Sequence, residues 1–212
     1  MSPRPRVLLG VAGQFALLVL PRVAPATVAE QRARLPPPKA CDDPVAGVWM
    51  SHQYSERRGT WDQFTLTIHR DPAAPGRLNG TIHNHVWEGG PADERPPPCE
   101  GQLDVVVRMN AEGQADGLKL RFDALDWAVE STICRTSGGY DLDHFSGTID
   151  PALQEFQSIN TYAEGTQTEA TVFRRIRCLD ENDPPDAPVV LPSLAPPPPF
   201  QPPSSTGCGG WA

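Results

Sequence analysis

The stretch Phe64-Thr65-Leu66-Thr67-Ile68-His69 decides the fold of this 212-residue chain. Every second side chain, beginning with Phe64, is large and apolar, and the side chains between are polar. Because successive side chains of a strand point to opposite faces, this alternation predicts a strand with one buried face. Thr and Ile strengthen the prediction, because residues branched at Cβ pack well on a pleated surface.

The same pattern recurs along the chain between residues 45 and 178. A turn-rich segment follows at 71–76, and a hairpin centred near Ala73–Ala74 would pair Thr65 with His83. No run shows a helical stripe of ten residues or more. Nine runs read as strands: residues 47–54, 64–69, 79–87, 103–109, 118–125, 129–134, 140–149, 153–162 and 166–177.

Many short antiparallel strands must bury one face and protect their edges. A closed up-and-down barrel does both, whereas a β-sandwich is an alternative that alternation alone does not distinguish. We therefore predict an all-β domain over residues 45–180, with a closed antiparallel up-and-down β-barrel as the favoured architecture.

The prolines mark the limits of this domain. Ten of the 25 prolines lie in residues 184–203, and Pro151 is the only proline in 101–183. Proline lacks the N–H that a strand ladder needs, and it breaks helices. We interpret residues 30–44 as a Pro-rich linker and residues 181–212 as a disordered Pro-rich tail.

Residues 1–29 have the three parts of a secretory signal peptide. Arg4 and Arg6 supply the positive start, and Val7–Leu20 supplies 14 mostly apolar residues. Small residues follow in Ala24-Pro25-Ala26 and in Thr27-Val28-Ala29, and either could be the cleavage site. A helix of that length spans about 21 Å, short of the ~30 Å hydrocarbon core, so no membrane span is expected after cleavage. The predicted location is secreted or periplasmic.

Export places the five cysteines in an oxidising compartment, where disulfides form. No Cys-x-x-Cys pair is present, which disfavours a structural zinc site. Cys41 precedes the first strand-like run and Cys178 ends the last, so barrel closure would bring them together. We favour Cys41–Cys178 with Cys99–Cys134, and the other two pairings of these four stay open. Cys208 is left over, as a free thiol or an intermolecular link.

The charge balance is acidic, with 18 Lys and Arg against 26 Asp and Glu, for a formal net charge of −8. Loss of residues 1–29 removes three arginines and no acid, which makes the charge −11. A negative domain repels phosphate backbones and anionic headgroups. Nucleic acid and the membrane surface are therefore not expected partners.

The two ends of the domain resemble a known group of barrels. The first run opens Ala46-Gly47-Val48-Trp49, and the last contains Thr171-Val172-Phe173-Arg174-Arg175-Ile176. This resembles the calycin group, the lipocalins and avidins, in which Gly-x-Trp opens the first strand and a basic residue of the last strand packs over the tryptophan. The order of residues 64–68 and 76–82 is similar to the second and third strands of avidin-like barrels.

The resemblance implies that Trp49 caps one end of the barrel beneath a guanidinium group. Alternation favours Arg174 as its partner, because Arg174 shares a strand face with Val172 and Ile176.

Polar residues on the apolar faces are the strongest functional signal. Buried polar groups need hydrogen-bond partners, and a barrel interior can supply them through a ligand or through water. Alternatively these groups bond one another or face solvent at an open end. The predicted ligand-binding residues are Trp49, Ser51, Gln53, Phe64, Asn84, Phe122, Ser131, Tyr140, His144 and Arg174.

Neither metal nor cofactor is expected. The histidines of His83-Asn84-His85 share the solvent side of their strand, and the cluster of Asp141, Asp143 and His144 has too few ligands for calcium. No Gly-x-Ser-x-Gly motif frames a nucleophile. We therefore expect no enzyme, and an enzyme of this fold would need an internal acid or base, for which His144 is the best candidate.

The sequence thus predicts a barrel that binds a small, partly apolar molecule without chemistry. The alternative is an exported protein-interaction module, such as an inhibitor or envelope-surface domain, that contacts a protein partner through the Pro-rich loop 88–101 and the tail.

Overall fold

The computed structural model describes residues 27–162, 165 and 167–179. Nearly all of the predicted leader and tail therefore lie outside the described residues. The elements are α1 (Val28–Arg34), β1 (Gly47–Met50), β2 (Gln53–Ser55), β3 (Thr60–Asp71), β4 (Ala74–Glu88), β5 (Asp104–Asp116), β6 (Lys119–Ala124), β7 (Ala128–Thr132), β8 (His144–Asp150), β9 (Glu155–Tyr162) and β10 (Gln167–Arg177).

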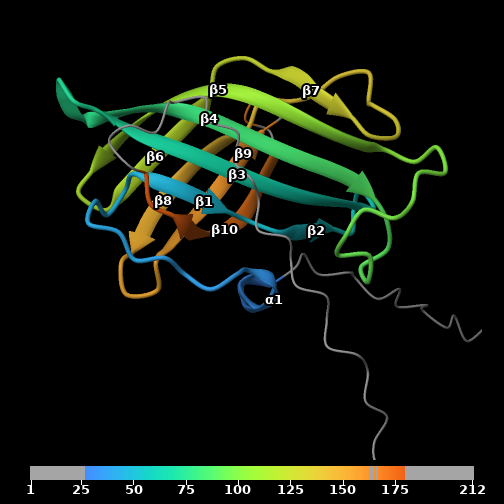
Figure 1. The fold of residues 1–212 in the computed structure, drawn as a ribbon, viewed down its shortest axis with the longest axis horizontal. Helices are drawn as coiled ribbons and strands as arrows, with labels where there is room; N and C mark the ends of the chain where they lie inside the picture. The colour runs from blue at the N-terminus through green and yellow to red at the C-terminus, as the bar shows by residue number, and fades with distance from the viewer. Residues whose placement is uncertain (1–26, 163–164, 166, 180–212) are drawn as a thin grey trace, which may run out of the picture.

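Eight of the strands form a closed antiparallel barrel (Figure 1). The order is β1-β10-β9-β8-β6-β5-β4-β3, and β1 also pairs with β3, which closes the ring. Neighbouring strands follow chain order except where β1 meets β10, so the topology is up-and-down. The all-β prediction and the barrel are confirmed, and the β-sandwich is excluded.

The hairpin of β3 and β4 has the predicted register, with Thr65 opposite His83. Both strands extend further than the sequence indicates, because the turn needs only Pro72 and Ala73. Phe64 faces inward and meets aromatic rings from β8 and β10. Its ring centroid lies 5.2 Å from that of Phe145, and Phe145 lies 4.9 Å from Phe173. Full burial of such side chains contributes roughly 1.5–3 kcal/mol each.

Trp49 is fully buried and packs under a guanidinium group, but the partner is Arg175 rather than Arg174. Arg175 lies 4.7 Å from the indole centroid and donates to the carbonyl oxygens of Ala46 (3.2 Å) and Pro44 (3.2 Å). A Cβ on Gly47 would stand 2.9 Å from Cδ of Arg175. The glycine of the Gly-x-Trp pattern thus makes room for the stacked arginine.

The prediction of Arg174 is wrong because both faces of β10 are covered. Phe173 and Arg175 face the core, so Arg174 and Val172 face outward. Val172 is nevertheless buried, because α1 lies against β10 on the outside of the barrel (Figure 1). Val172 is therefore apolar although it lies on the outer face, and alternation taken from Val172 assigns the inner face of β10 incorrectly.

The segment that we predicted as a linker contains α1, which belongs to the folded domain. Thr27 and Glu30 form a capping box at its start. Gln31 donates to the carbonyl oxygen of Ala170 (2.8 Å) and accepts from the amide of Val172 (2.9 Å), as a neighbouring strand would. None of the helices in the described residues is long and apolar enough to span a membrane.

Within the described residues the chain forms two disulfides, and they are the favoured pairs. Cys41–Cys178 joins the chain just before β1 to the chain just after β10, with Cα atoms 5.6 Å apart. Cys99–Cys134 joins the loop after β4 to the segment after β7, with Cα atoms 5.3 Å apart. Cys208 lies outside the described residues.

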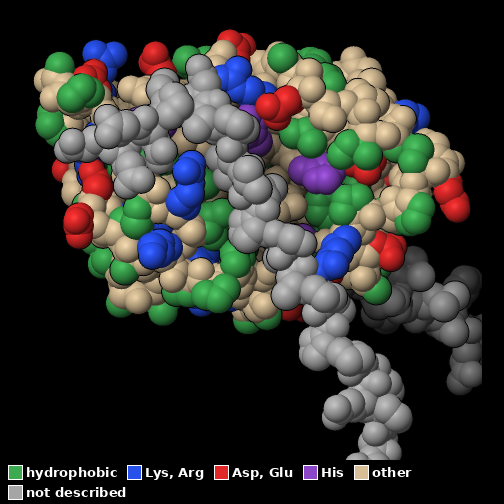
Figure 2. All heavy atoms as spheres, viewed as in Figure 1, with side chains coloured by type: hydrophobic (Ala, Val, Ile, Leu, Met, Phe, Trp, Pro, Cys, Tyr) green, Lys and Arg blue, Asp and Glu red, His purple; other side chains and the backbone are tan. Residues whose placement is uncertain are grey.

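The outer face of β3 and β4 carries a second aromatic cluster. Trp61 and Trp87 are stacked with centroids 6.1 Å apart, and His52 meets the edge of Trp61 at 4.8 Å. The loop between β4 and β5 covers them, because Trp61 donates to the carbonyl oxygen of Gly90 and Trp87 to that of Asp93, each at 3.0 Å. Figure 2 shows histidine side chains partly exposed between basic and acidic side chains on the face in view.

Candidate functional site

A cavity of about 330 Å³ lies at the end of the barrel away from the β3–β4 turn. Asp62, on its wall, is four residues along β3 from Leu66, the partner of Trp49, so the cavity and the tryptophan cap are separate. A larger depression of about 710 Å³ lies at the tips of the β3–β4 and β5–β6 hairpins, but it is shallow and open. The cavity is lined by Arg57, Arg58, Thr60, Asp62, Phe64, Asn84, Val86, Leu103, Val105, Ser137, Gly139, Tyr140, Asp141, Asp143, Asn160, Tyr162 and Gln167.

The first buried acid of the cavity is Asp62 on β3, two residues before Phe64 and on the same inner face. Its carboxylate forms an ion pair with Arg58 at 2.5 Å and accepts from Nδ2 of Asn84 at 3.1 Å. Burial raises the pKa of Asp62, and the charge of Arg58 and the bond from Asn84 oppose that rise. The negative charge of Asp62 is therefore balanced by Arg58 within the protein.

The second buried acid is Asp143, the residue before β8. Its Oδ1 accepts from Nδ2 of Asn160 and its Oδ2 accepts from the hydroxyl of Tyr140, each at 2.6 Å. Tyr140 in turn accepts from Nδ2 of Asn84 at 2.7 Å. Asn84 therefore connects the two acids through one side chain.

Asp143 differs from Asp62 in having no cation as a partner. No Lys, Arg or His of the described residues forms an ion pair with it. Burial raises the pKa of Asp143 to about 7, against the bonds from Asn160 and Tyr140 that favour the charged form. Burial and the neighbouring Asp143 also raise the pKa of the Tyr140 phenol, which stays a neutral donor.

Arginines from the β2–β3 turn form part of the cavity rim. Arg57 donates to the hydroxyl of Tyr162 at 3.0 Å and to the side chain of Gln167. Arg58 lies over the ring of Tyr162, 5.8 Å from its centroid. These contacts bridge β9 and β10 to the β2–β3 turn beside the cavity.

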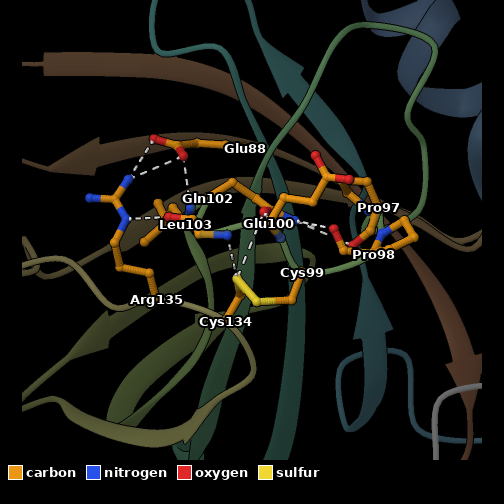
Figure 3. Close-up of a disulfide and its surroundings, with 10 residues drawn as sticks. Glu88, Pro97, Pro98, Cys99, Glu100, Gln102, Leu103, Cys134 and Arg135 are labelled. Carbon is orange, nitrogen blue, oxygen red and sulfur yellow. Dashed lines mark hydrogen bonds and ion pairs between the residues drawn. A yellow bond between two sulfur atoms is a disulfide. The ribbon is translucent and has the colours of Figure 1, made fainter.

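Figure 3 shows the Cys99–Cys134 disulfide and its surroundings. The disulfide anchors the segment that continues to Tyr140 and Asp143 at the cavity. Next to it, Arg135 pairs with Glu88 at 3.2 Å and donates to the carbonyl oxygen of Gly101 at 2.9 Å. Glu88 also accepts from the amide of Leu103 at 2.7 Å. Since Leu103 and the segment after Arg135 both line the cavity, the disulfide braces one of its walls.

The predicted ligand-binding residues divide into three groups. Phe64, Asn84 and Tyr140 line the cavity. Four others are buried elsewhere in the interior or beside it: Trp49, Ser51, Gln53 and Phe122. Ser131, His144 and Arg174 do not face the interior, so their predicted inward placement is wrong.

The errors have separate physical causes. Ser131 is exposed because β7 pairs with β5 alone and diverges from the ring. His144 faces outward, where its Nδ1 lies 3.2 Å from Asp123, because β8 begins only at His144 and alternation does not extend back to Tyr140. Arg174 lies on the outer face and pairs with Glu155 at 2.8 Å.

Sequence reasoning missed Asp62, Arg58 and Asn160. Two of them have a signal, since Asp62 shares the parity of Phe64, and Asn160 shares that of Phe156, a core residue. Arg58 lies in a turn, where no periodicity operates.

The histidines of β4 lie on its outer side, as expected. His85 lies 2.8 Å from Asp104, and His83 lies 3.7 Å from Glu130. Over the described part of the chain, no group of three or more His, Cys, Asp or Glu could hold a metal ion.

The fold and the cavity define a disulfide-bonded, closed eight-stranded β-barrel with a polar, two-acid cavity at one end. A scan against protein-family models, a search of curated proteins and a search of solved structures each found no match. The likeness to calycins therefore rests on the barrel and on the Trp49–Arg175 pair.

Proposed function

We propose that this protein is a secreted or periplasmic binding protein that holds a small, partly apolar molecule in the cavity and does not transform it. The observation that carries the proposal is a buried hydrogen-bonding atom left without a partner at the cavity wall. Among the described residues, nothing bonds to Oδ1 of Asn84, although the side chain is 1 % exposed. A buried polar atom in this state costs about 1–3 kcal/mol, which a ligand donor would recover.

The rest of the wall suits a ligand with an apolar portion. Phe64, Val86, Leu103 and Val105 line one part of the cavity, beside the network of Asn84. Small-molecule sites combine such apolar walls with a few placed polar groups. The two disulfides support an oxidising location outside the cytoplasm.

The test is native mass spectrometry of the full chain purified from its own host, compared with a Val86→Phe variant. Phenylalanine at this position would fill part of the cavity, and we expect a co-purifying small molecule in the parent and at least a tenfold lower occupancy in the variant. Lys119→Ala, on a hairpin away from the cavity, is the control and should keep the ligand. Absence of any bound molecule in the parent, or equal occupancy in Val86→Phe, would contradict the proposal.

A protein-interaction module is the second candidate, and an exposed apolar group favours it. Leu125, Trp127, Val129 and Ile133 are each at least 41 % exposed, along and beside β7. The Pro-rich loop is joined to this region through Cys99–Cys134. Pull-downs from the host with the full chain and with Trp127→Ser/Ile133→Ser would test it: partners captured equally by both would exclude this surface.

A further inference from the structure

We propose that the ligand of the cavity is a small organic cation, whose ammonium group bonds to Asp143 and Asn84; this inference rests on the proposed binding function. The proposal follows from the direction of the hydrogen bonds and the distribution of charge around the cavity.

The buried polar atoms that remain without a partner at the cavity wall can all accept a hydrogen bond. Nδ2 of Asn84 already donates to Asp62 and to Tyr140, and Tyr140 donates its only hydrogen to Asp143. What is left is Oδ1 of Asn84 and the hydroxyl of Thr60, which have no partner in the described chain, and the remaining lone pairs of the carboxylates. A group that only donates fits such a wall, and an ammonium group has three donors and no acceptor.

Of the two buried acids at the cavity wall, only one has a positively charged partner. Arg58 compensates Asp62 at 2.5 Å, whereas Asp143 receives hydrogen bonds from neutral groups alone. A buried carboxylate needs a counter-charge, and without one it tends to hold a proton. The pKa of Asp143, raised by burial to about 7 although the charge of Arg58 lowers it, agrees with an acid that has no cation in hydrogen-bond contact.

The cationic groups nearby are engaged elsewhere. Arg58 is held by Asp62 and Ser55, and Arg57 by Tyr162 and Gln167. The acids on the same side outnumber them: Asp62, Asp143, Asp141 and the partly buried Glu169, whose pKa is raised by burial and by Asp62. An anionic ligand would meet this excess of like charge, while a cation would offset it.

The remaining walls suit the organic portion of such a ligand. Phe64, Tyr140 and Tyr162 present aromatic rings to the cavity, and ring faces attract cations as well as apolar groups. A volume of about 330 Å³ accommodates a molecule of the size of an arylalkylamine.

The experiment uses three probes of one shape and different charge, which are benzylamine, benzyl alcohol and benzoate. Binding to the full chain at pH 8 is measured by isothermal titration calorimetry. We expect benzylamine to bind about 10- to 100-fold more tightly than benzyl alcohol, the effect of a hydrogen bond to a charged group, and benzoate to bind more weakly than either.

Asp143→Asn should bring benzylamine to the affinity of benzyl alcohol while leaving benzyl alcohol unchanged. Asp116→Asn removes an exposed acid at the β5–β6 hairpin, away from the cavity, and should reduce benzylamine binding less than threefold. Benzylamine binding to the parent should weaken below pH 7 as Asp143 takes up a proton, and this pH dependence should disappear in Asp143→Asn. The groups that face Asp143 and share this titration are Asp62, Arg58 and Tyr140.

Equal affinity for benzylamine and benzyl alcohol, or unchanged benzylamine binding in Asp143→Asn, overturns the inference and leaves the binding function in place. Loss of benzyl alcohol binding in Asp143→Asn signals damage to the cavity. Tyr140→Phe then decides, because it frees one acceptor position of Asp143 without changing charge, and it must retain the preference for the amine. Failure of all three probes to bind overturns the inference, and the Val86→Phe comparison judges the binding function separately.

Discussion

At the residue scale, His52 and Asp143 are both buried titratable groups, and they change the stability in opposite directions with pH. His52 is 1 % exposed, and neither ring nitrogen has a partner within the described residues. Burial, together with the charges of Arg34 and His85, lowers its pKa from 6.5 to about 4. The pKa of Asp143 instead rises from 3.8 to about 7.

For His52, the unfolded chain binds a proton below pH 6.5 and the folded chain does so only near pH 4. The titration of His52 therefore lowers the free energy of unfolding by about 3 kcal/mol as the pH decreases from 6.5 to about 4. We expect His52→Phe to gain stability relative to the parent by about this amount from pH 7 to pH 4. Urea unfolding over the pH series measures it, and a constant difference between the two proteins would contradict it.

For Asp143, the folded chain keeps its proton up to about pH 7, whereas the unfolded chain releases it near 3.8. Its contribution is present at low pH and is lost as the pH rises through 7, by about 4 kcal/mol. Asp143→Asn should therefore become more stable than the parent between pH 4 and pH 8. A variant that loses stability equally at both values would show that Asp143 is compensated in the folded state.

Single residues also show what alternation can predict. Phe64, Asn84 and the Thr65–His83 register follow from a period of two, because β3 and β4 are long and regular. Asp62 follows the same rule but requires the strand to begin earlier than the apolar run does. Arg174 could not be placed correctly, because the outer face of β10 is covered by a helix that lies far away in the sequence.

At the element scale, the loop between β4 and β5 is a structural part of both faces of the barrel. Its start is pinned to Trp61 and Trp87 outside, and its end is tied through Cys99–Cys134 to the segment that lines the cavity. No periodicity could reveal this, because the loop is rich in proline and is held by tertiary contacts. The sequence indicated a long loop and its disulfide, and only the fold shows which wall the loop supports.

The two disulfides should separate stability from binding. Their sequence separations of 35 and 137 residues correspond to about 4 and about 5 kcal/mol in the chain-entropy description. We expect Cys99→Ser/Cys134→Ser to weaken binding of the co-purified ligand at least tenfold, because the segment of Tyr140 loses its anchor. Cys41→Ser/Cys178→Ser should lower the melting temperature at least as much yet retain affinity at 15 °C. Equal effects on binding would show that the anchor has no local role.

The short helix α1 acts as an element of the barrel wall. It has only seven residues, too few for a periodic stripe to identify it from sequence. Gln31 occupies the edge of β10 beyond the short pairing with β1, bonding the carbonyl of Ala170 and the amide of Val172. The helix thereby replaces strand contacts that β1 does not reach.

Gln31→Ala leaves these two backbone groups without their side-chain partner. We expect a loss of about 1–3 kcal/mol in the free energy of unfolding and faster hydrogen exchange at the Val172 amide. Gln31→Glu retains the acceptor for Val172 and loses the donor to Ala170, so it should protect the Val172 amide more than Gln31→Ala does. Unchanged exchange in Gln31→Ala would show that the wall is closed without the helix.

At the scale of the whole molecule, the ring and the cavity arise from one arrangement. The eight strands fill most of their interior with aromatic and aliphatic side chains, and the cavity forms where β7 diverges and the segment before β8 turns inward. The sequence indicated the barrel, because Gly47–Trp49 and the last strand have to meet when the sheet closes. It did not indicate the two-acid network, since Asp143 lies outside any regular strand.

Because β1 pairs with both β3 and β10, the ring closes only when β10 is in place. A chain that emerges from a pore amino end first presents β1 early, and β1 can pair with β3 soon afterwards. The other edge of β1 stays unpaired until β10 is available, so a chain made from its amino end exposes an open sheet edge until then. In the same way, Cys41 has no disulfide partner until Cys178 has been made. The last strand and Cys178 thus complete both the ring and the disulfide. A chain that ended before β10 would be an open sheet, whose unpaired edges could pair with other copies of the chain.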